Sequence, residues 1–219
     1  MRRFLVLACL ALILSSRPTG AEPRRYAIVA ADVVREMNLA RQHPEVYAGY
    51  LETLRGSFHG KILVLPGRTM MRTKEGVGAV NDAIRFLRGA RPLAPLACSP
   101  GISMAAADHV ADQASDGFGH GGSDRTNPAQ RMNRHGTWSG GWAENISYGK
   151  ATAREIVIAL LIDDGLRGRK HRKNIFNPAF NFAGAAAGSH ARYGTVCSID
   201  FAAGYVETAS ASRALIARN

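Results

Sequence analysis

Cysteine and acidic residues are both scarce in this chain of 219 residues. Three cysteines occur, and none forms a CxxC pair, which argues against a structural zinc site made of thiolates. Asp and Glu number 17 against 28 Lys and Arg, so the formal net charge is +11. The first 21 residues carry three of these positive charges and no acid, and the remainder keeps +8. Such a charge favours anionic surroundings such as envelope polymers, lipid head groups or nucleic acid.

Several enzyme signatures are also missing. The sequence has no HExxH motif, no GxSxG nucleophile elbow and no phosphate-binding loop. Ser139, in GTWSGGW, lacks the leading glycine of such an elbow. These absences argue against a serine hydrolase without excluding one.

No apolar run is long enough to span a bilayer. The run Phe4–Leu14 is too short, follows paired arginines and precedes small residues before Glu22. This order predicts a signal peptide over residues 1–21, and the alternative is an uncleaved anchor. We therefore expect a single domain over residues 22–219 that is secreted or periplasmic.

The few cysteines agree with export. Cys9 would leave with the signal peptide, and Cys98 and Cys197 would remain. Two cysteines in an oxidising compartment favour one disulfide, and the alternative is two buried free thiols.

Apolar periodicity and capping residues predict a mixture of helices and a few antiparallel strands, which indicates an α+β layered domain. The expected helices cover residues 32–43, 44–54, 77–89, 99–115 and 152–165, and the expected strands cover 182–190 and 195–203. Residues 56–76 are expected to form an insertion. Residues 117–150, rich in Gly, Ser, Asn and His, are expected to form a long irregular stretch, and such loops are often functional.

Polar residues in glycine-rich settings are the candidates for chemistry. His120 lies in GFGHGGSD, Glu144 in GGWAENISYG, and His171 follows Asp164 across two glycines. Two imidazoles and one or two carboxylates suit a divalent transition metal with open coordination positions. The alternative is structural: hydrogen-bonded histidines, Glu144 capping a turn, and Asp163 and Asp164 only ending a helix.

The basic stretch Arg167–Pro178, RGRKHRKNIFNP, has two interpretations of its own. It is either a solvated charged face or a loop that presents His171. Nucleic-acid recognition is not expected, because Phe176 is the only aromatic residue near it and the predicted export argues against such a partner.

The order of several segments resembles the secreted bacterial branch of the CAP superfamily. This superfamily holds cysteine-rich secretory proteins, antigen-5-type venom proteins and pathogenesis-related plant proteins. The segments that carry the resemblance are PLAPLACSPGISMAAADHVADQ, FGHGGSD, AENISYG, GRKHRKNIFNPAFNFAGAAAG and YGTVCSIDFA. They span roughly Asp32 to Tyr205, and AEN and HRKN at this separation are fairly specific.

The resemblance implies a three-layer α-β-α sandwich with a small antiparallel central sheet and a central cleft. In several members the cleft holds two histidines and two acids and binds a divalent metal such as zinc. By motif, the ligand set here would be His120, Glu144, Asp163 and His171, with Asp164 as the alternative acid. An aspartate in place of the usual glutamate shortens the reach of the second acid.

The resemblance also implies a mostly non-catalytic role. We expect a monomeric secreted binding protein with a metal-capable cleft, whose partner is a lipid, a cell-envelope component or another protein. The alternative is a metal-dependent hydrolase in which a metal activates a water and Glu144 is the general base. A third possibility is a structural, disulfide-tied domain with a vestigial cleft.

Overall fold

The computed structural model describes the backbone of residues 22–211 and the side chains of residues 31–211. The predicted signal peptide lies outside the described residues. The helices are α1 (Glu22–Gln42), α2 (Pro44–Arg55), α3 (Val77–Gly89), α4 (Pro100–Gln113), α5 (Pro128–Met132), α6 (Ala153–Ile162) and α7 (Lys170–Ile175). The strands are β1 (Phe58–His59), β2 (Ile62–Leu63), β3 (Met71–Arg72), β4 (Ala97–Cys98), β5 (Gly136–Tyr148), β6 (Phe182–His190) and β7 (Gly194–Glu207). No helix among these is long and apolar enough to cross a membrane.

The central sheet has four strands in the order β4-β6-β7-β5. The three long strands are antiparallel to their neighbours, whereas the short β4 pairs with β6 in parallel. Strand β5 therefore forms one edge, and its free side is the place where loops can meet the sheet.

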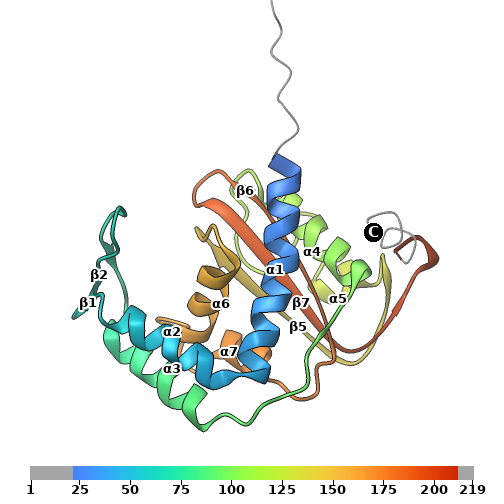
Figure 1. Cartoon of the computed structure of the whole chain (residues 1–219). Coiled ribbons are helices and arrows are strands. Elements are labelled where there is room, and N and C mark those ends of the chain that lie inside the picture. Colours follow the sequence, from blue (N-terminus) through green and yellow to red (C-terminus); the bar gives the residue numbers. More distant parts are fainter. Residues whose placement is uncertain (1–21, 212–219) are drawn as a thin grey trace, which may run out of the picture.

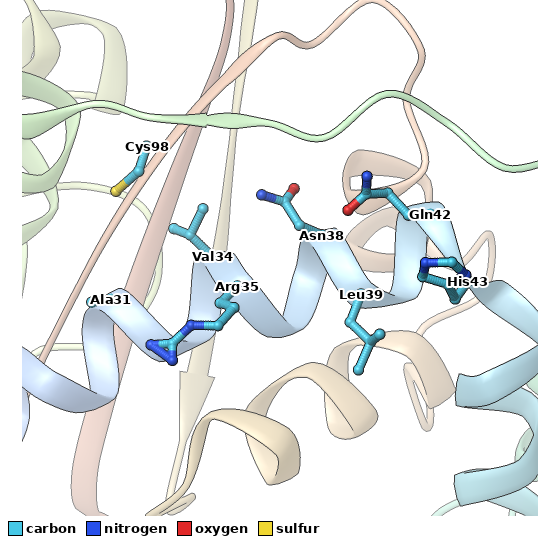
Figure 2. A pocket seen from close by; sticks show the side chains of 8 residues that line it. All are labelled: Ala31, Val34, Arg35, Asn38, Leu39, Gln42, His43 and Cys98. Atoms are coloured by element: carbon cyan, nitrogen blue, oxygen red, sulfur yellow. The ribbon is translucent and has the colours of Figure 1, made fainter.

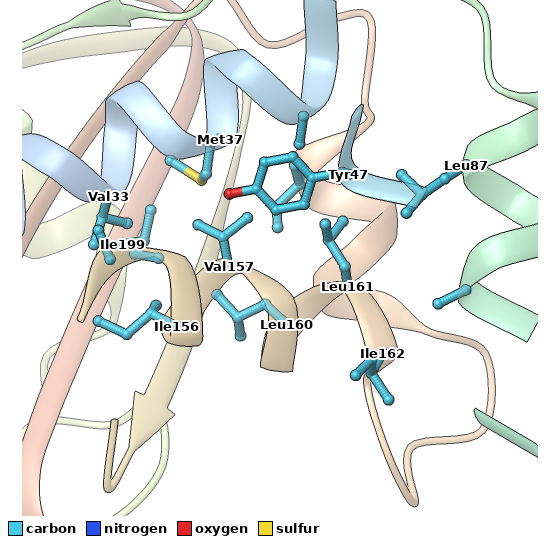
Figure 3. Packing of buried hydrophobic residues seen from close by; sticks show 14 of the residues in the cluster. Val33, Met37, Tyr47, Leu87, Ile156, Val157, Leu160, Leu161, Ile162 and Ile199 are labelled. Atoms are coloured by element: carbon cyan, nitrogen blue, oxygen red, sulfur yellow. The ribbon is translucent and has the colours of Figure 1, made fainter. Parts of the chain in front are cut away.

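Helices cover both faces of this sheet (Figure 1). On one face α1 packs against β6 and α6, and α2 and α3 pack beside them; on the other face α4 lies across β6 and β7 with α5 next to it. This arrangement confirms the predicted three-layer α-β-α sandwich. The larger apolar cluster lies between the sheet and α1 and α6, where Met37, Val157 and Ile199 interdigitate (Figure 3).

The helix α4 approaches the sheet unusually closely because β6 is built from small residues. Ser99 caps this helix by accepting a hydrogen bond from the Ile102 backbone N–H at 3.0 Å, and Pro100 follows as its first residue. A Cβ atom on Gly184 of β6 would lie 2.2 Å from the Ser103 nitrogen. The run FAGAAAG thus sets the spacing between the two layers.

The segment 117–150 is more regular than the sequence predicts. It contains α5, which Asn127 starts with a capping box, and the long strand β5. The prediction of an irregular stretch was wrong because Gly140 and Gly141 interrupt the alternation of β5. Both glycines have positive φ, and the register with β7 shifts between Ser139 and Trp142, as in a β-bulge.

The expected insertion forms a small structure of its own. Strands β1, β2 and β3 pair antiparallel in a three-stranded sheet separate from the central one. In Figure 1 this unit projects from the body beside α2 and α3. We refer to residues 56–76 as the insertion hairpin.

The predicted disulfide is wrong, because Cys98 and Cys197 are both free thiols. Cys98 on β4 lies opposite Ala183 on β6, and Ala183 lies opposite Phe201 on β7, four residues from Cys197. Two strand spacings of about 4.8 Å and four residues of about 3.3 Å each therefore separate the thiols, beyond the reach of a disulfide. Cys98 instead lines a surface hollow beside α1 (Figure 2), whereas Cys197 is buried in the core.

Candidate functional site

The first candidate histidine is paired with the first candidate acid. His120, in the loop between α4 and α5, donates from Nδ1 to the Glu144 Oε1 atom at 2.7 Å. The Glu144 side chain on β5 is only 1% exposed, whereas that of His120 is 57% exposed. The buried carboxylate thus holds an imidazole whose other nitrogen remains at the surface.

The second oxygen of Glu144 is also occupied. Its Oε2 atom accepts hydrogen bonds from Arg131 at 2.8 Å and from the Ser198 hydroxyl at 3.0 Å. Arg131 is 2% exposed and also donates to the backbone carbonyls of His120 and Thr126. This buried guanidinium neutralises the carboxylate and fixes the His120 loop. The sequence analysis missed Arg131, because nothing in its local pattern indicates the partner.

The second histidine is paired with the acid at the end of α6. Asp163 ends that helix in a left-handed conformation, with φ of 55°. Its Oδ1 atom accepts from His171 Nδ1 at 2.8 Å, and its Oδ2 atom accepts from the His171 backbone N–H at 3.0 Å. The carboxylate therefore fixes both the backbone and the ring of His171.

Asp164 faces a different partner. Its carboxylate accepts hydrogen bonds from the backbone N–H groups of Lys74 and Glu75, both at 2.7 Å. Asp164 thus ties the end of the insertion hairpin to the α6–α7 loop. Of the two alternatives, Asp163 is the acid that lies beside His171.

Two arginines of the basic stretch are structural. Arg172 is 3% exposed and donates to Asp82 at 3.0 Å and to the Leu161 carbonyl at 2.5 Å. Arg169 forms a two-fold hydrogen-bonded pair with Glu75. The stretch is therefore not only a solvated face, since these side chains lock the loop that carries His171.

The two histidine–carboxylate pairs are connected through β5. The Asn145 side chain, next to Glu144, donates from Nδ2 to the His171 carbonyl at 3.0 Å. Because consecutive strand residues point to opposite faces, Glu144 contacts the His120 ring from one face of β5 and Asn145 contacts the His171 backbone from the other. The sequence predicts that all four side chains meet in one cleft, and the structure brings each histidine to one acid.

The four candidate ligands lie as two pairs rather than as one cluster. Within residues 31–211, no three His, Cys, Asp or Glu side chains are grouped so that they could hold a metal ion. Each imidazole uses Nδ1 for its carboxylate and leaves Nε2 for another partner. This is the arrangement of a metal-binding histidine oriented by an outer carboxylate, so the residues fit two imidazole ligands with Glu144 and Asp163 as orienting groups.

Further buried ionisable groups lie beside Glu144. Asp200 on β7, the cross-strand neighbour of Glu144, is fully buried, and neither of its carboxyl oxygens has a hydrogen-bond partner within residues 31–211. Burial and the negative charge of Glu144 raise the pKa of Asp200 well above its ordinary value. Burial lowers the pKa of His109, whose Nε2 atom lies 3.9 Å from Glu144. The sequence analysis did not single out Asp200.

This geometry can be compared with known protein families. Residues 77–201 match the family model described as the cysteine-rich secretory protein family, CAP. This chain belongs to the CAP family. The matched range includes all four candidate residues and begins directly after the insertion hairpin. No curated protein sequence matches the chain.

Bacterial CAP-type proteins are also among the similar solved structures. An extracellular protein with an SCP domain from Bacillus anthracis is 20% identical, with 56% of this chain and 38% of that chain covered and a TM-score of 0.41. An outer surface protein from Borrelia burgdorferi is 15% identical, with 50% of this chain and 78% of that chain covered and a TM-score of 0.41. A cysteine-rich secretory protein from Staphylococcus aureus is 13% identical, with 58% of this chain and 38% of that chain covered and a TM-score of 0.36. The chain thus spans well under half of two of these proteins, and the family assignment rests on the family model.

Proposed function

We propose that this CAP protein is an exported, non-catalytic binding protein. His120 and His171 would contact a lipid, cell-envelope or protein ligand, either directly or through a divalent metal such as zinc. The predicted signal peptide over residues 1–21 supports the exported location.

The observation that carries the proposal is that both oxygens of the buried Glu144 carboxylate are engaged in hydrogen bonds. A general base needs a free lone pair within reach of the water that it activates. Both oxygens of Glu144 already accept hydrogen bonds, from His120, Arg131 and Ser198, and the side chain is 1% exposed. These contacts favour an orienting role for Glu144 and argue against the hydrolase alternative.

A bound metal would rely on the two histidines. His120 and His171 would supply Nε2, and Glu144 and Asp163 would hold the two rings in orientation. A zinc ion with two imidazole ligands keeps open positions that can accept oxygen or nitrogen atoms of a second molecule. The protein's own part is to hold both imidazole rings in place through their Nδ1 atoms.

Calorimetric titration of the chain with zinc tests this proposal. Wild type is expected to bind zinc, and His120→Ala and His171→Ala are expected to weaken binding by at least tenfold each. His59→Ala, at an exposed histidine of the insertion hairpin, is the matched control and should titrate as wild type. Equal binding by all four proteins would remove the metal from the proposal.

Turnover assays separate the binder from the hydrolase. The chain is incubated with peptide and cell-wall fragment libraries, alone and with zinc. No turnover is expected from wild type. Turnover that disappears in Glu144→Gln would establish the hydrolase and overturn the non-catalytic proposal.

A further inference from the structure

The insertion hairpin combines positive charge with exposed apolar side chains. Residues 53–74 contain five Lys or Arg residues and no Asp or Glu. Four of the five lie in the hairpin itself: Lys61, Arg68, Arg72 and Lys74. All four are exposed, and Arg68 is the one that forms an ion pair within the described residues, with Glu155. Glu75, the one acid in the sequence of residues 56–76, pairs with Arg169, so Lys61, Arg72 and Lys74 form a basic surface without an ion pair among the described residues.

The same hairpin exposes large apolar side chains. Met70 is 68% exposed, Met71 is 41% exposed and Val64 is 37% exposed, whereas Leu63 turns inward and is 7% exposed. Exposed methionines beside arginine are not needed to bind a soluble anion. Apolar side chains flanked by Lys and Arg are instead typical of segments that enter the boundary between lipid head groups and acyl chains.

The fold holds this hairpin firmly in its projecting position (Figure 1). At its base, Asp164 accepts from the Lys74 and Glu75 backbone, and Glu75 accepts from the Gly165 N–H at 2.6 Å and from Arg169. Between its strands, the Thr73 N–H donates to the Lys61 carbonyl at 2.8 Å. Because these contacts fix the hairpin to the body, its exposed side chains are presented together.

We propose that the insertion hairpin docks on an anionic lipid surface. Lys61, Arg72 and Lys74 would lie among the negative head groups, and Met70 and Met71 would reach the acyl boundary. The hairpin lies outside the range matched by the family model, so this contact would be a property of this chain's insertion. It is independent of the two histidines and of any metal that they hold.

Vesicle binding by the full chain tests the proposal. Tighter binding is expected to mixed phosphatidylglycerol–phosphatidylcholine vesicles than to pure phosphatidylcholine, with the difference falling at high salt. Lys61→Gln and Arg72→Gln should each weaken binding to the anionic vesicles about fivefold, and Met70→Ser with Met71→Ser about tenfold. Arg192→Gln and Val206→Ser change exposed residues outside the hairpin and should bind as wild type. All changes are at exposed positions, so melting temperatures should stay unchanged.

A local measurement separates the hairpin from the apolar run near the N-terminus, which every variant retains. Anionic vesicles are expected to slow the oxidation of Met70 and Met71 to the sulfoxide, as read by mass spectrometry, whereas phosphatidylcholine vesicles should not. Unchanged oxidation rates in a vesicle-bound chain would overturn the proposal. A second result would also overturn it: soluble polyphosphate protects Met70 and Met71 as well as anionic vesicles do, and the two serine substitutions leave vesicle binding unchanged. The partner would then be a polymer recognised by charge alone.

Discussion

The Asn174 side chain donates from Nδ2 to the Asn145 Oδ1 atom at 2.8 Å. Asn145 is fully buried, and its own Nδ2 donates to the His171 carbonyl. The two asparagines therefore clamp the AEN segment of β5 to the HRKN segment of α7. Each motif supplies one candidate site residue, Glu144 or His171, and one asparagine that joins the two motifs.

Breaking this clamp should destabilise the fold. Asn174→Ala leaves the buried Oδ1 of Asn145 without a donor, which costs about 1–3 kcal/mol of unfolding free energy. Denaturant unfolding measures the loss. Asn181→Ala, which removes an exposed side-chain bond to the Ala203 carbonyl, should cost less than about 0.5 kcal/mol. Equal effects of the two changes would contradict the clamp.

Removing Arg131 should be costly because it strands a buried charge. Arg131→Met leaves Glu144 without its cationic partner, and a buried ion pair broken on one side typically costs about 3–5 kcal/mol. The double variant Arg131→Met with Glu144→Gln should recover part of this loss. A double-mutant cycle from urea unfolding measures the coupling, and additive effects would show that the pair contributes nothing.

Glu75 should make stability depend on pH in the acid range. Hydrogen bonds from Arg169 and from the Gly165 N–H lower the pKa of Glu75 to about 2, from an ordinary value of 4.5. Between these two values Glu75 stays ionised in the folded state but takes up a proton in the unfolded state. Its contribution to folding stability is therefore present above pH 4.5 and is lost as pH falls toward 2. Glu75→Gln should flatten the fall of the melting temperature in that window. A variant that follows the wild-type profile would contradict the assignment.

Asp200 should act in the opposite direction. Burial and the charge of Glu144 raise its pKa above the ordinary 3.8, so the unfolded state loses its proton first as pH rises. From about pH 4 upward, the free energy of unfolding of wild type should therefore fall relative to that of Asp200→Asn. The slope is at most about 1.4 kcal/mol per pH unit, as long as the folded state binds one proton more than the unfolded state. Urea unfolding of both proteins across this range measures the difference. A difference that stays constant with pH would show that Asp200 is ionised in the fold.

The two thiols should differ in reactivity. Burial raises the pKa of both thiols, that of Cys197 to about 12. Cys197 lies in the core, whereas Cys98 is exposed to reagents. An alkylating reagent should therefore label Cys98 and leave Cys197 unmodified until the chain unfolds. Peptide mass spectrometry reads the two sites separately. A reducing agent should leave the melting temperature unchanged, and a Cys98–Cys197 cross-linked peptide would contradict the structure.

Much of the fold could be predicted from local sequence signals such as helix-capping residues. Ser99 and Thr152 cap their helices through side-chain hydrogen bonds, as expected from their positions before apolar periodic segments. The choice of His120, Glu144, His171 and Asp163, with Asp164 as the alternative acid, followed from a family pattern of motifs. These features depend on neighbours in sequence or on a family pattern, so the sequence is sufficient for them.

Long-range features could not be predicted in the same way. Two cysteines in an exported chain favour a bond, but only the register through Ala183 and Phe201 shows how far apart they lie. Arg131 meets Glu144 only because α5 packs against β5. The partner of Asp164 depends likewise on where the insertion hairpin returns to the body.

The bulge in β5 bends the strand without deciding which side of the sheet carries the acid. Ser139 lies opposite Gly204 and Trp142 lies opposite Ala202, so β5 uses one residue more than β7 over this stretch. Deleting Gly140 or Gly141 would therefore restore a regular ladder in which Glu144 still lies opposite Asp200. Pairing with β7 fixes the side of the candidate acid, and the glycine pair adds only the bend.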